Sequence, residues 1–353
     1  MSNKVRIGFV GVGGMGQCAH LRNYAAIPDC EVVAIAEPLE IRARKVAARY
    51  GVPHVYKSHL EMLAAEKLDG IVCSQPFTRH GVLMKDLLKA GVPILTEKPL
   101  AGSIEVGERI LKQLAESGTW HMLGYHKRSD PATIWAKEQI GQLKQSGEIG
   151  KLNYIRLLMP SGDWIANGFL EFISDQNNAA HSNLEWDPAP PDMDEATAKA
   201  YESFVNYYIH QVNLLRHLLG ESYHVTFADK AGKLLVAESA GGITATIEMT
   251  PYSTTVDWQE SALVAFERGY VKLELPAPLA HTRCGRVEVL RDPGKGATPI
   301  TTIPTLPWVH AMRQQALNFI RAIRGEIKPP CEAAEALEDL RVAREYIRLW
   351  KGK

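Results

Sequence analysis

Gly11-Val12-Gly13-Gly14-Met15-Gly16 directly follows the apolar run of residues 5–10 and precedes a helical pattern. The order is therefore strand, glycine turn and helix, with the G-x-G-x-x-G spacing. Gly11 permits a tight turn, Gly13 lets a pyrophosphate approach the backbone, and Gly16 lets helix and strand pack closely. The helix N-terminus offers N–H groups and a positive dipole end to phosphates. We expect these residues to bind a dinucleotide: Gly11, Gly13, Gly14, Met15 and Gly16.

Glu37 ends a second apolar run, residues 31–36, at roughly the 20-residue distance at which a ribose-binding acid follows such glycines. Its carboxylate would accept the ribose hydroxyls and repel a 2′-phosphate, so we expect NAD as the cofactor in preference to NADP. The alternative is an ordinary βαβ turn in which Glu37 faces solvent. Arg42, Arg44 and Lys45 follow and could soften the preference for NAD, although on a helix we expect them to be solvated.

The first third of the chain alternates between strand and helix patterns. Helices are predicted over 41–50, from the capping box at 58–61, and over 80–90 and 104–117; strands are predicted over 71–74, 93–96 and 120–124. Repeated units of this length predict a Rossmann-type, doubly wound parallel sheet, in which ligands bind beyond the carboxyl ends of the strands. The further cofactor-binding candidates are therefore Ser74, Pro76, His80, Glu97 and Lys98.

The pattern changes after residue 124. A helix over 131–145 leads to a strand near 152–159, and period-two patterns without intervening helices follow over 242–249, 270–275 and 286–289. The tail, 309–350, reads as two helices broken at Pro329-Pro330. The sequence thus predicts an α/β protein: a dinucleotide-binding domain over 1–124 and an α+β domain with a large, mostly antiparallel open sheet over 125–353.

Composition excludes several classes of protein. The chain has 353 residues, 46% of them hydrophobic, with 40 acidic and 40 basic side chains, so it has no basic footprint for nucleic acid. No stretch is long and apolar enough to span a bilayer, and the first strand begins too early to leave room for a signal peptide. The five cysteines form no C-x-x-C pair and resemble reduced thiols. We expect a cytoplasmic protein with no membrane or nucleic-acid partner.

The chain resembles the Gfo/Idh/MocA oxidoreductases over nearly its whole length. The resemblance rests on the order and spacing of several motifs: the glycine turn, Pro76 with His80, Glu97-Lys98-Pro99, residues 124–128, residues 147–150 and residues 210–215. It implies a nicotinamide-dependent dehydrogenase acting on sugars, polyols or their derivatives. It also implies that the sheet of the second domain forms the subunit interface, so we expect a homodimer or homotetramer.

Lys98 takes its expected role from this resemblance. In the family the matching lysine contacts the substrate hydroxyl and the nicotinamide ribose. An ammonium group can polarise a carbonyl oxygen or lower the cost of forming an alkoxide. Judged by its own surroundings in the sequence, a lysine at this position would more often be a solvated charge. We expect Lys98 to be catalytic and to contact both cofactor and substrate.

His210 is the second catalytic candidate, within a helix predicted over 203–219. In the family the matching histidine transfers the proton, and imidazole titrates near the pH at which a general base must work; the alternative is a buried core histidine. Many relatives have aspartate four residues before and three residues after it, where this chain has Asn206 and Asn213. An asparagine oxygen can orient the ring but cannot stabilise an imidazolium as a carboxylate does. Both asparagines remain substrate-binding candidates.

The stretch 160–202 has little periodicity. Tryptophans argue against disorder, and a tryptophan face beside polar side chains suits a sugar ring, so Asp163 and Trp164 are substrate-binding candidates, as are His126 and Lys127 just past the last strand of the first domain. Equally, Trp164 and Trp186 could only attach the loop to the body of the protein. The spacing of His181, Glu185 and Asp187 matches no standard metal site, so no metal is expected.

These observations together predict an NAD-dependent dehydrogenase of a sugar, a polyol or a related hydroxyl compound. Hydride would leave the carbinol carbon while His210 takes the hydroxyl proton and Lys98 polarises the oxygen. Two alternatives stay open: a redox-neutral glycosidase that retains NAD, as some relatives are, and an NAD-binding regulator without turnover.

Overall fold

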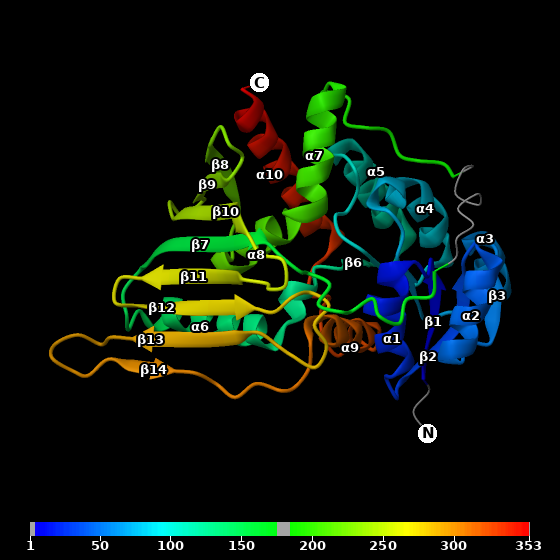
Figure 1. The fold of residues 1–353 in the computed structure, drawn as a ribbon, viewed down its shortest axis with the longest axis horizontal. Coiled ribbons are helices and arrows are strands. Elements are labelled where there is room, and N and C mark those ends of the chain that lie inside the picture. Colours follow the sequence, from blue (N-terminus) through cyan, green and yellow to red (C-terminus); the bar gives the residue numbers. More distant parts are fainter. Residues whose placement is uncertain (1–3, 175–183, 353) are drawn as a thin grey trace. The chain divides into compact units, whose positions relative to one another are not determined.

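A computed structural model describes residues 4–174 and 184–352, which form two compact units (Figure 1). Unit 1 consists of Met1–Tyr125, Asn167–Ala198 and Gln315–Leu340, and unit 2 of His126–Ala166, Lys199–Gln314 and Arg341–Lys353. Two later segments of the chain thus join the amino-terminal part in unit 1. The assignment of cofactor binding to 1–124 and of substrate binding to 125–353 stays a prediction.

Unit 1 is built on a six-stranded parallel sheet with the order β3-β2-β1-β4-β5-β6. The strand order reverses between β1 and β4, as in a doubly wound dinucleotide-binding fold, so the predicted fold is confirmed. Its strands are β1 Val5–Val10, β2 Cys30–Ala36, β3 His54–Tyr56, β4 Gly70–Cys73, β5 Ile94–Thr96 and β6 His121–Leu123. The sequence did not predict β3.

The helices of the amino-terminal segment connect these strands. They are the π-helical turn η1 Gly16–Leu21, α1 Arg22–Ala25, α2 Glu40–Tyr50, α3 His59–Ala65, the short 3-10 turn η2 Phe77–Arg79, α4 His80–Leu87, the 3-10 turn η3 Leu88–Ala90 and α5 Ile104–Ser117. Ser58 caps α3 as predicted, because its hydroxyl accepts a hydrogen bond from the backbone N–H of Glu61 at 3.2 Å. In a complete capping box the Glu61 carboxylate would accept the N–H of Ser58, but here it accepts the N–H of Lys57.

The core of unit 1 depends on residues from the far end of the chain. Phe319 is fully buried, with its ring centroid 6.3 Å from that of Tyr24 and 5.6 Å from that of Trp120. Tyr24 in turn meets Phe9 on β1 edge to face at 5.4 Å. The helix that carries Phe319 therefore completes the hydrophobic core of the amino-terminal sheet.

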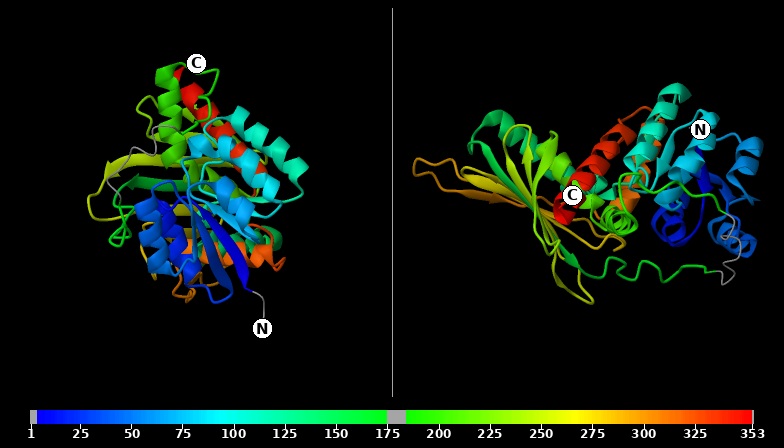
Figure 2. Two further views of the ribbon diagram at one scale, coloured as in Figure 1. Left: turned by 90° about the vertical axis from the view of Figure 1, so that its right-hand side faces the viewer. Right: turned by 90° about the horizontal axis from the view of Figure 1, so that it is seen from above.

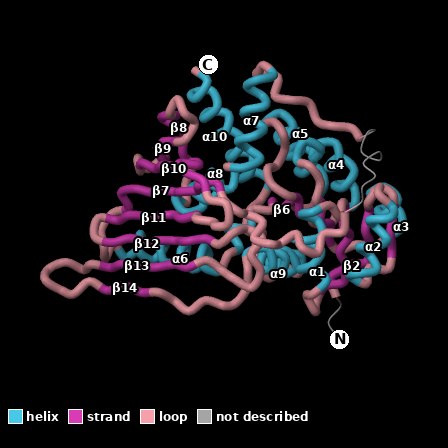
Figure 3. The backbone as a smooth tube through the Cα atoms, viewed as in Figure 1, coloured by secondary structure: helices cyan, strands magenta, loops and turns pink. Residues whose placement is uncertain are grey.

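Unit 2 is built on an eight-stranded sheet with the order β14-β13-β12-β11-β7-β10-β9-β8. Figure 3 shows these strands as magenta segments. All neighbours are antiparallel except β7 and β10, which run parallel, so the predicted mostly antiparallel sheet is confirmed. The strands are β7 Leu152–Ser161, β8 Tyr223–Ala228, β9 Leu234–Ser239, β10 Thr244–Ser253, β11 Glu260–Phe266, β12 Gly269–Leu275, β13 Arg286–Arg291 and β14 Ile300–Thr302.

The remaining helices are the 3-10 turn η4 His126–Ser129, α6 Pro131–Ser146, α7 Glu195–Tyr207, α8 Ile209–Leu219, α9 Ala311–Ile323 and α10 Ala333–Lys351. Within unit 2, α6 contacts β12 and β13, while α8 contacts β7 and β10; Figure 2 shows both helices on the same face of the sheet. Side chains on that face, such as Ile155 and Leu157, are buried. The opposite face carries half-buried residues, including Leu158 and Leu263.

The single helix predicted over 203–219 is wrong in one respect: the structure has two helices, α7 and α8, which meet at Tyr208. Tyr208 has φ −93° and ψ −3°, in a region between helix and extended backbone. Its hydroxyl is hydrogen-bonded to Thr250 Oγ1 on β10, a tertiary contact that fixes this residue to the sheet. The break places Asn206 on α7 and His210 on α8.

None of the described helices has the length and apolar character needed to cross a membrane.

Candidate functional site

The glycine turn in unit 1 has the geometry that its sequence predicts. Gly11 has φ +90°, and a Cβ there would collide with Gln75 and with the backbone of Ser74. A Cβ on Gly16 would collide with the carbonyl of Gly11, which confirms the close packing of helix on strand. By contrast, a Cβ on Gly13 would meet nothing within 4 Å. The turn is thus crowded on both sides and open at the position where a pyrophosphate would approach.

Backbone donors follow the open position. The first helical hydrogen bond runs from Gln17 N to Gly13 O at 2.9 Å, so the N–H groups of Gly14, Met15 and Gly16 precede the helical ladder. Gly13, Gly14 and Met15 are all half-buried. Such N–H groups, with the positive end of the helix dipole, suit an anionic ligand.

Glu37 lies at the end of β2 with only 3% of its surface exposed. Its carboxylate accepts hydrogen bonds from the N–H of Val12, at 3.1 Å, and from that of Leu39, at 3.2 Å. Arg42 Nη1 lies 4.0 Å away. The solvated alternative for Glu37 is therefore wrong, because the side chain is buried against the glycine turn. Arg44 is exposed and paired with Glu40 at 2.7 Å, as expected for a solvated helix face, but the same expectation is wrong for Arg42, which is buried.

A hollow of about 780 Å³ opens beside Glu37. It is lined by Glu37, Glu40, Arg44, Ala47, Ala48, Val52, Pro53, Val55, Tyr56, Lys57 and Glu61. Because it adjoins the acid at the end of β2, it offers space on the side of the turn where the adenosine half of a dinucleotide is expected.

Three of the predicted cofactor residues follow β4, two in the loop and His80 at the start of α4. Ser74 is half-buried and donates its N–H to Val10 O at 2.9 Å, and Pro76 precedes η2. His80 is fully buried, with its ring nitrogens 3.1 Å from Leu100 O and 3.3 Å from Gln75 O. Burial lowers the pKa of His80. His80 thus ties the loop after β4 to the loop that contains Lys98.

Glu97 and Lys98 follow β5, and the Lys98–Pro99 peptide bond is cis. His20 Nε2 lies 2.6 Å from Glu97 Oε1, and the Lys98 N–H donates to Glu97 Oε2 at 3.3 Å. Burial acts to raise the pKa of Glu97, but the hydrogen bond from His20 and the charge of Lys98 bring it below its usual value. An ionised Glu97 therefore anchors the backbone at the start of Lys98.

In unit 2, Lys127 forms a buried ion pair with Glu260, which sequence reasoning missed. Gln211 Nε2 donates to the other oxygen of this carboxylate, Oε1, at 2.8 Å, and Trp258 Nε1 donates to Oε2, the oxygen that Lys127 contacts, at 3.2 Å. The Lys127 ammonium also lies 5.8 Å from the centre of the Trp258 ring. Because Gln211 directly follows His210, the ion pair fixes the first turn of α8.

The rings of His126 and His210 meet edge to face, with their centroids 4.7 Å apart. Asn213 is buried on α8, and its oxygen accepts a hydrogen bond from Arg128 Nε at 2.7 Å. Asn206 is exposed on α7. With Lys127, these are five of the seven predicted substrate residues that belong to unit 2, and His126 and His210 are in direct contact.

Asp163 and Trp164 also belong to unit 2. Both side chains are half-buried. Asp163 Oδ1 accepts hydrogen bonds from the N–H groups of Ile165, at 3.0 Å, and Ala166, at 2.9 Å, so it shapes its own loop. Of the loose His181, Glu185 and Asp187 group, His181 lies outside the described residues. Within residues 4–174 and 184–352, no cluster of three or more His, Cys, Asp or Glu is placed to hold a metal ion.

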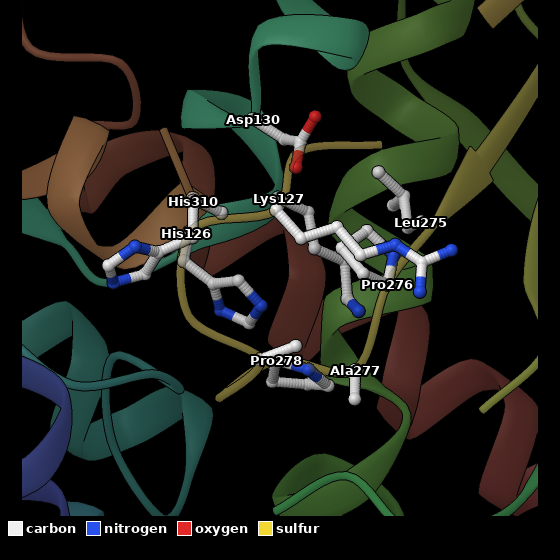
Figure 4. A pocket seen from close by; sticks show the side chains of 11 residues that line it. His126, Lys127, Asp130, Leu275, Pro276, Ala277, Pro278 and His310 are labelled. Atoms are coloured by element: carbon white, nitrogen blue, oxygen red, sulfur yellow. The ribbon is translucent and has the colours of Figure 1, made fainter. Parts of the chain in front are cut away.

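A small pocket adjoins His126 and Lys127 (Figure 4). Its lining residues are His126, Lys127, Asp130, Leu275, Pro276, Ala277, Pro278, Ala280, Arg283, His310 and Ala311. The cavity measures about 10 Å³, which is space for roughly one water molecule. Asp130 caps α6 here, accepting hydrogen bonds from Ala132 N at 2.8 Å and Gly285 N at 3.0 Å. Burial nevertheless raises its pKa to about 6.

Comparison with known proteins matches residues 5–125 to a family described as "Oxidoreductase family, NAD-binding Rossmann fold". The chain is 27% identical over 236 residues to scyllo-inositol 2-dehydrogenase (NAD(+)) of Bacillus subtilis, an alignment that covers 67% of this chain and 59% of that protein. The chain therefore matches less than two thirds of this relative's length.

Two solved structures share the fold over nearly their full lengths. An aldose-aldose oxidoreductase from Caulobacter crescentus, complexed with glycerol, has a TM-score of 0.71 at 16% identity, covering 99% of this chain and 98% of that one. A 3-ketoreductase from Actinomadura kijaniata, in complex with TDP-benzene and NADP, has a TM-score of 0.68 at 16% identity, covering 97% and 96%. At this level of identity the likeness establishes the fold alone.

The raised pKa of Asp130 predicts a pH-dependent stability. Between its ordinary value of 3.8 and about 6, the unfolded chain releases this proton before the folded one does, so stability falls as pH rises through this window. Because the asparagine side chain does not titrate, the Asp130→Asn variant does not lose stability in this pH window. Relative to the natural protein it should gain stability between pH 4 and pH 7, by up to about 3 kcal/mol. Urea unfolding of both proteins at pH 4, 5.5 and 7 measures the difference.

Glu202→Gln, at an exposed position on α7, is the matched control and should show no comparable pH-dependent gain. A stability difference between Asp130→Asn and the natural protein that stays constant over this pH range would contradict the assignment.

Proposed function

Because the chain belongs to the Gfo/Idh/MocA oxidoreductase family through residues 5–125, we propose that it is an NAD-dependent dehydrogenase of a sugar, a polyol or a related hydroxyl compound. The scyllo-inositol dehydrogenase of Bacillus subtilis supports a polyol as the first substrate class to test. Since the alignment spans only part of that relative, the activity of this chain is a proposal.

One observation carries the cofactor part of this proposal. The glycine turn is open at Gly13 alone, and the buried Glu37 carboxylate stands directly beside it, bonded to Val12 N. These residues fit a dinucleotide: the N–H groups at the start of the helix would hold the pyrophosphate and Glu37 would accept the ribose hydroxyls. When bound, the nicotinamide would accept hydride from the carbinol carbon.

We assign the proton chemistry to His210 and Lys98, following the family resemblance. In the direction of oxidation, the hydroxyl proton passes to the His210 imidazole as the carbinol C–H bond breaks and the C=O bond forms. By the same resemblance, the Lys98 ammonium would stabilise negative charge on a substrate oxygen. Gln211, held by Glu260, supports His210 by fixing the first turn of α8. In reverse, the same groups would reduce a ketone.

A substrate panel tests the proposal. The purified protein is incubated with NAD and with inositols, aldoses, uronates and aryl glycosides, and NADH formation is followed by absorbance. Net NADH formation supports a dehydrogenase. Cleavage of a glycoside without net NADH identifies the redox-neutral glycosidase instead. Cofactor binding without any conversion across the panel indicates a regulator and contradicts the proposal.

Cofactor preference is the first prediction of the proposed function. NAD should bind at least tenfold more tightly than NADP, a difference of about 1.4 kcal/mol, because the Glu37 carboxylate repels a 2′-phosphate. Titrations of both cofactors measure the ratio. Glu37→Gln keeps the shape of the side chain but removes its charge, so it should reduce the ratio of NAD affinity to NADP affinity. Equal or reversed affinities in the natural protein would refute the role of Glu37; a bound NADP in one similar structure makes this comparison necessary.

Catalytic substitutions are the second prediction. Lys98→Ala and His210→Ala should each lower kcat by about a hundredfold or more, in keeping with electrostatic and general acid–base contributions. NAD affinity should change little in His210→Ala. Near-normal turnover of both single variants on a confirmed substrate would refute the mechanism.

Assembly through the sheet of unit 2 is the third prediction. The face opposite α6 and α8 carries Leu158, Leu263 and Tyr154, and the bidentate pair of Arg156 with Glu248 at 2.7 and 2.9 Å. A half-apolar sheet face of this kind suits a twofold interface. Light scattering should show a homodimer or homotetramer. Leu263→Glu should shift the association equilibrium toward the monomer.

Val256→Glu, at an 88% exposed loop position, is the matched control for Leu263→Glu and should leave the assembly unchanged. A natural protein that is monomeric at micromolar concentration would refute assembly through the sheet.

A further inference from the structure

The connection between β7 and α7 returns to unit 1, where residues 167–173 lie against the glycine turn. These residues belong to the stretch 160–202, which has little periodicity and shows no local pattern that predicts a contact with the turn. In Figure 1 it can be followed as green chain near α1. The segment and the residues that it contacts all belong to unit 1.

The first contact is made by Gln17, which is only 1% exposed. Its amide nitrogen donates to Ile173 O at 3.0 Å, and its amide oxygen accepts from Ile173 N at 3.0 Å. The same nitrogen also donates to Val12 O at 2.7 Å, inside the glycine turn. One buried side chain therefore joins the turn to the 167–173 segment through three hydrogen bonds.

The second contact is apolar. A Cβ built on Gly14 would lie 3.3 Å from the ring of Phe169, so the absence of a side chain at Gly14 lets the ring come close to the turn. Phe169 is half-buried, whereas its neighbour Leu170 is 81% exposed. The segment thus directs one aromatic ring at the turn and leaves the next apolar side chain in solvent.

Cations hold the rest of the segment. Arg49 donates to the carbonyl of Glu171, Arg22 lies 3.8 Å from the Glu171 carboxylate, and the Arg42 guanidinium lies 5.9 Å from the centre of the Phe172 ring. Because Arg42 also faces Glu37 at 4.0 Å, the segment contacts a neighbour of the acid at the ribose position as well as the turn.

A second part of the same connection is anchored beyond β4. The Asp187 carboxylate is 1% exposed and accepts hydrogen bonds from Gly81 N, at 2.7 Å, and Arg109 Nη2, at 2.9 Å. Arg79 Nε donates to Glu185 O at 3.0 Å, and its guanidinium lies 5.7 Å from the centre of the Trp186 ring. The two anchored parts therefore lie on either side of the β1–β4 switch point, where a doubly wound sheet binds its dinucleotide.

We propose that residues 167–173 are part of the dinucleotide site, with Phe169 as an apolar cover beside the phosphate-binding turn, and that this cover slows release of the cofactor. The inference rests on the proposed function, since it presumes that the turn binds NAD. An aromatic ring at the turn excludes water from the N–H groups that hold the phosphates, and such hydrogen bonds are stronger at lower local dielectric. Gln17 is a positioning residue, because it holds the segment in place through Ile173.

Stopped-flow measurement of NADH release tests the proposal. NADH is bound to the full-length protein and displaced with excess NAD, and the loss of its fluorescence gives the dissociation rate. Phe169→Ala should release NADH at least about tenfold faster, with a weaker affinity and a nearly unchanged association rate. Phe169→Leu, which keeps apolar bulk, should show a smaller increase. Leu170→Ala, at the adjacent exposed position, is the matched control and should release NADH at the natural rate.

Gln17→Leu tests whether the position of the 167–173 segment matters while Phe169 itself is unchanged. Leucine fills a similar buried volume but cannot make the two hydrogen bonds to the backbone of Ile173. Gln17→Leu should also accelerate release, while thermal unfolding of the cofactor-free protein confirms that the variant is folded. Unchanged release from Phe169→Ala overturns the inference. Tighter binding and faster association in Phe169→Ala also overturn it, since they would mean that the ring blocks the site. Failure of the natural protein to bind NADH overturns the proposed function itself, and the two failures are thus distinguishable.

Discussion

A buried carboxylate joins the first two strands of unit 1. Glu37 accepts the N–H of Val12 at the end of β1 and that of Leu39 beyond β2, so one charged side chain fixes the position of the glycine turn. Burying an ionised carboxylate is costly unless hydrogen bonds and a nearby cation compensate, and here Arg42 supplies the cation. The open space at Gly13, the loop after β4 and the 167–173 segment all adjoin the turn that Glu37 contacts.

Unit 2 also buries a carboxylate, that of Glu260. Its two oxygens face Lys127, Gln211 and Trp258, so a charge within the sheet layer is neutralised and hydrogen-bonded. Removing one partner of such a pair is expected to cost far more than the pair contributes to stability, because the remaining charge is stranded. The ion pair therefore fixes the first turn of α8 through Gln211. This turn carries His210, whose ring contacts that of His126.

Features set by neighbouring residues could be predicted from the sequence, and features set by distant ones could not. The glycine turn, the Ser58 cap and the strand alternation depend on local spacing, and the structure agrees with them. The partner of Lys127 lies 133 residues away and leaves no local pattern. The helix break lies at Tyr208, whose hydroxyl is hydrogen-bonded to Thr250 on β10, and the local helical pattern shows neither the break nor this tertiary contact. The Gln17–Ile173 contact joins residues 156 apart, which hid the relation between the irregular stretch and the glycine turn.

The composition of the core of unit 1 has a consequence for the order of folding. Phe319 packs against Tyr24 and Trp120, yet it is synthesised only when most of the 353 residues have been made. Contacts between such distant residues form slowly, because a long loop must close before they contribute. As the chain leaves the ribosome, the early parallel strands can pair while Tyr24 and Trp120 still lack this neighbour. The core of the amino-terminal sheet can therefore be completed only after Phe319 has been made.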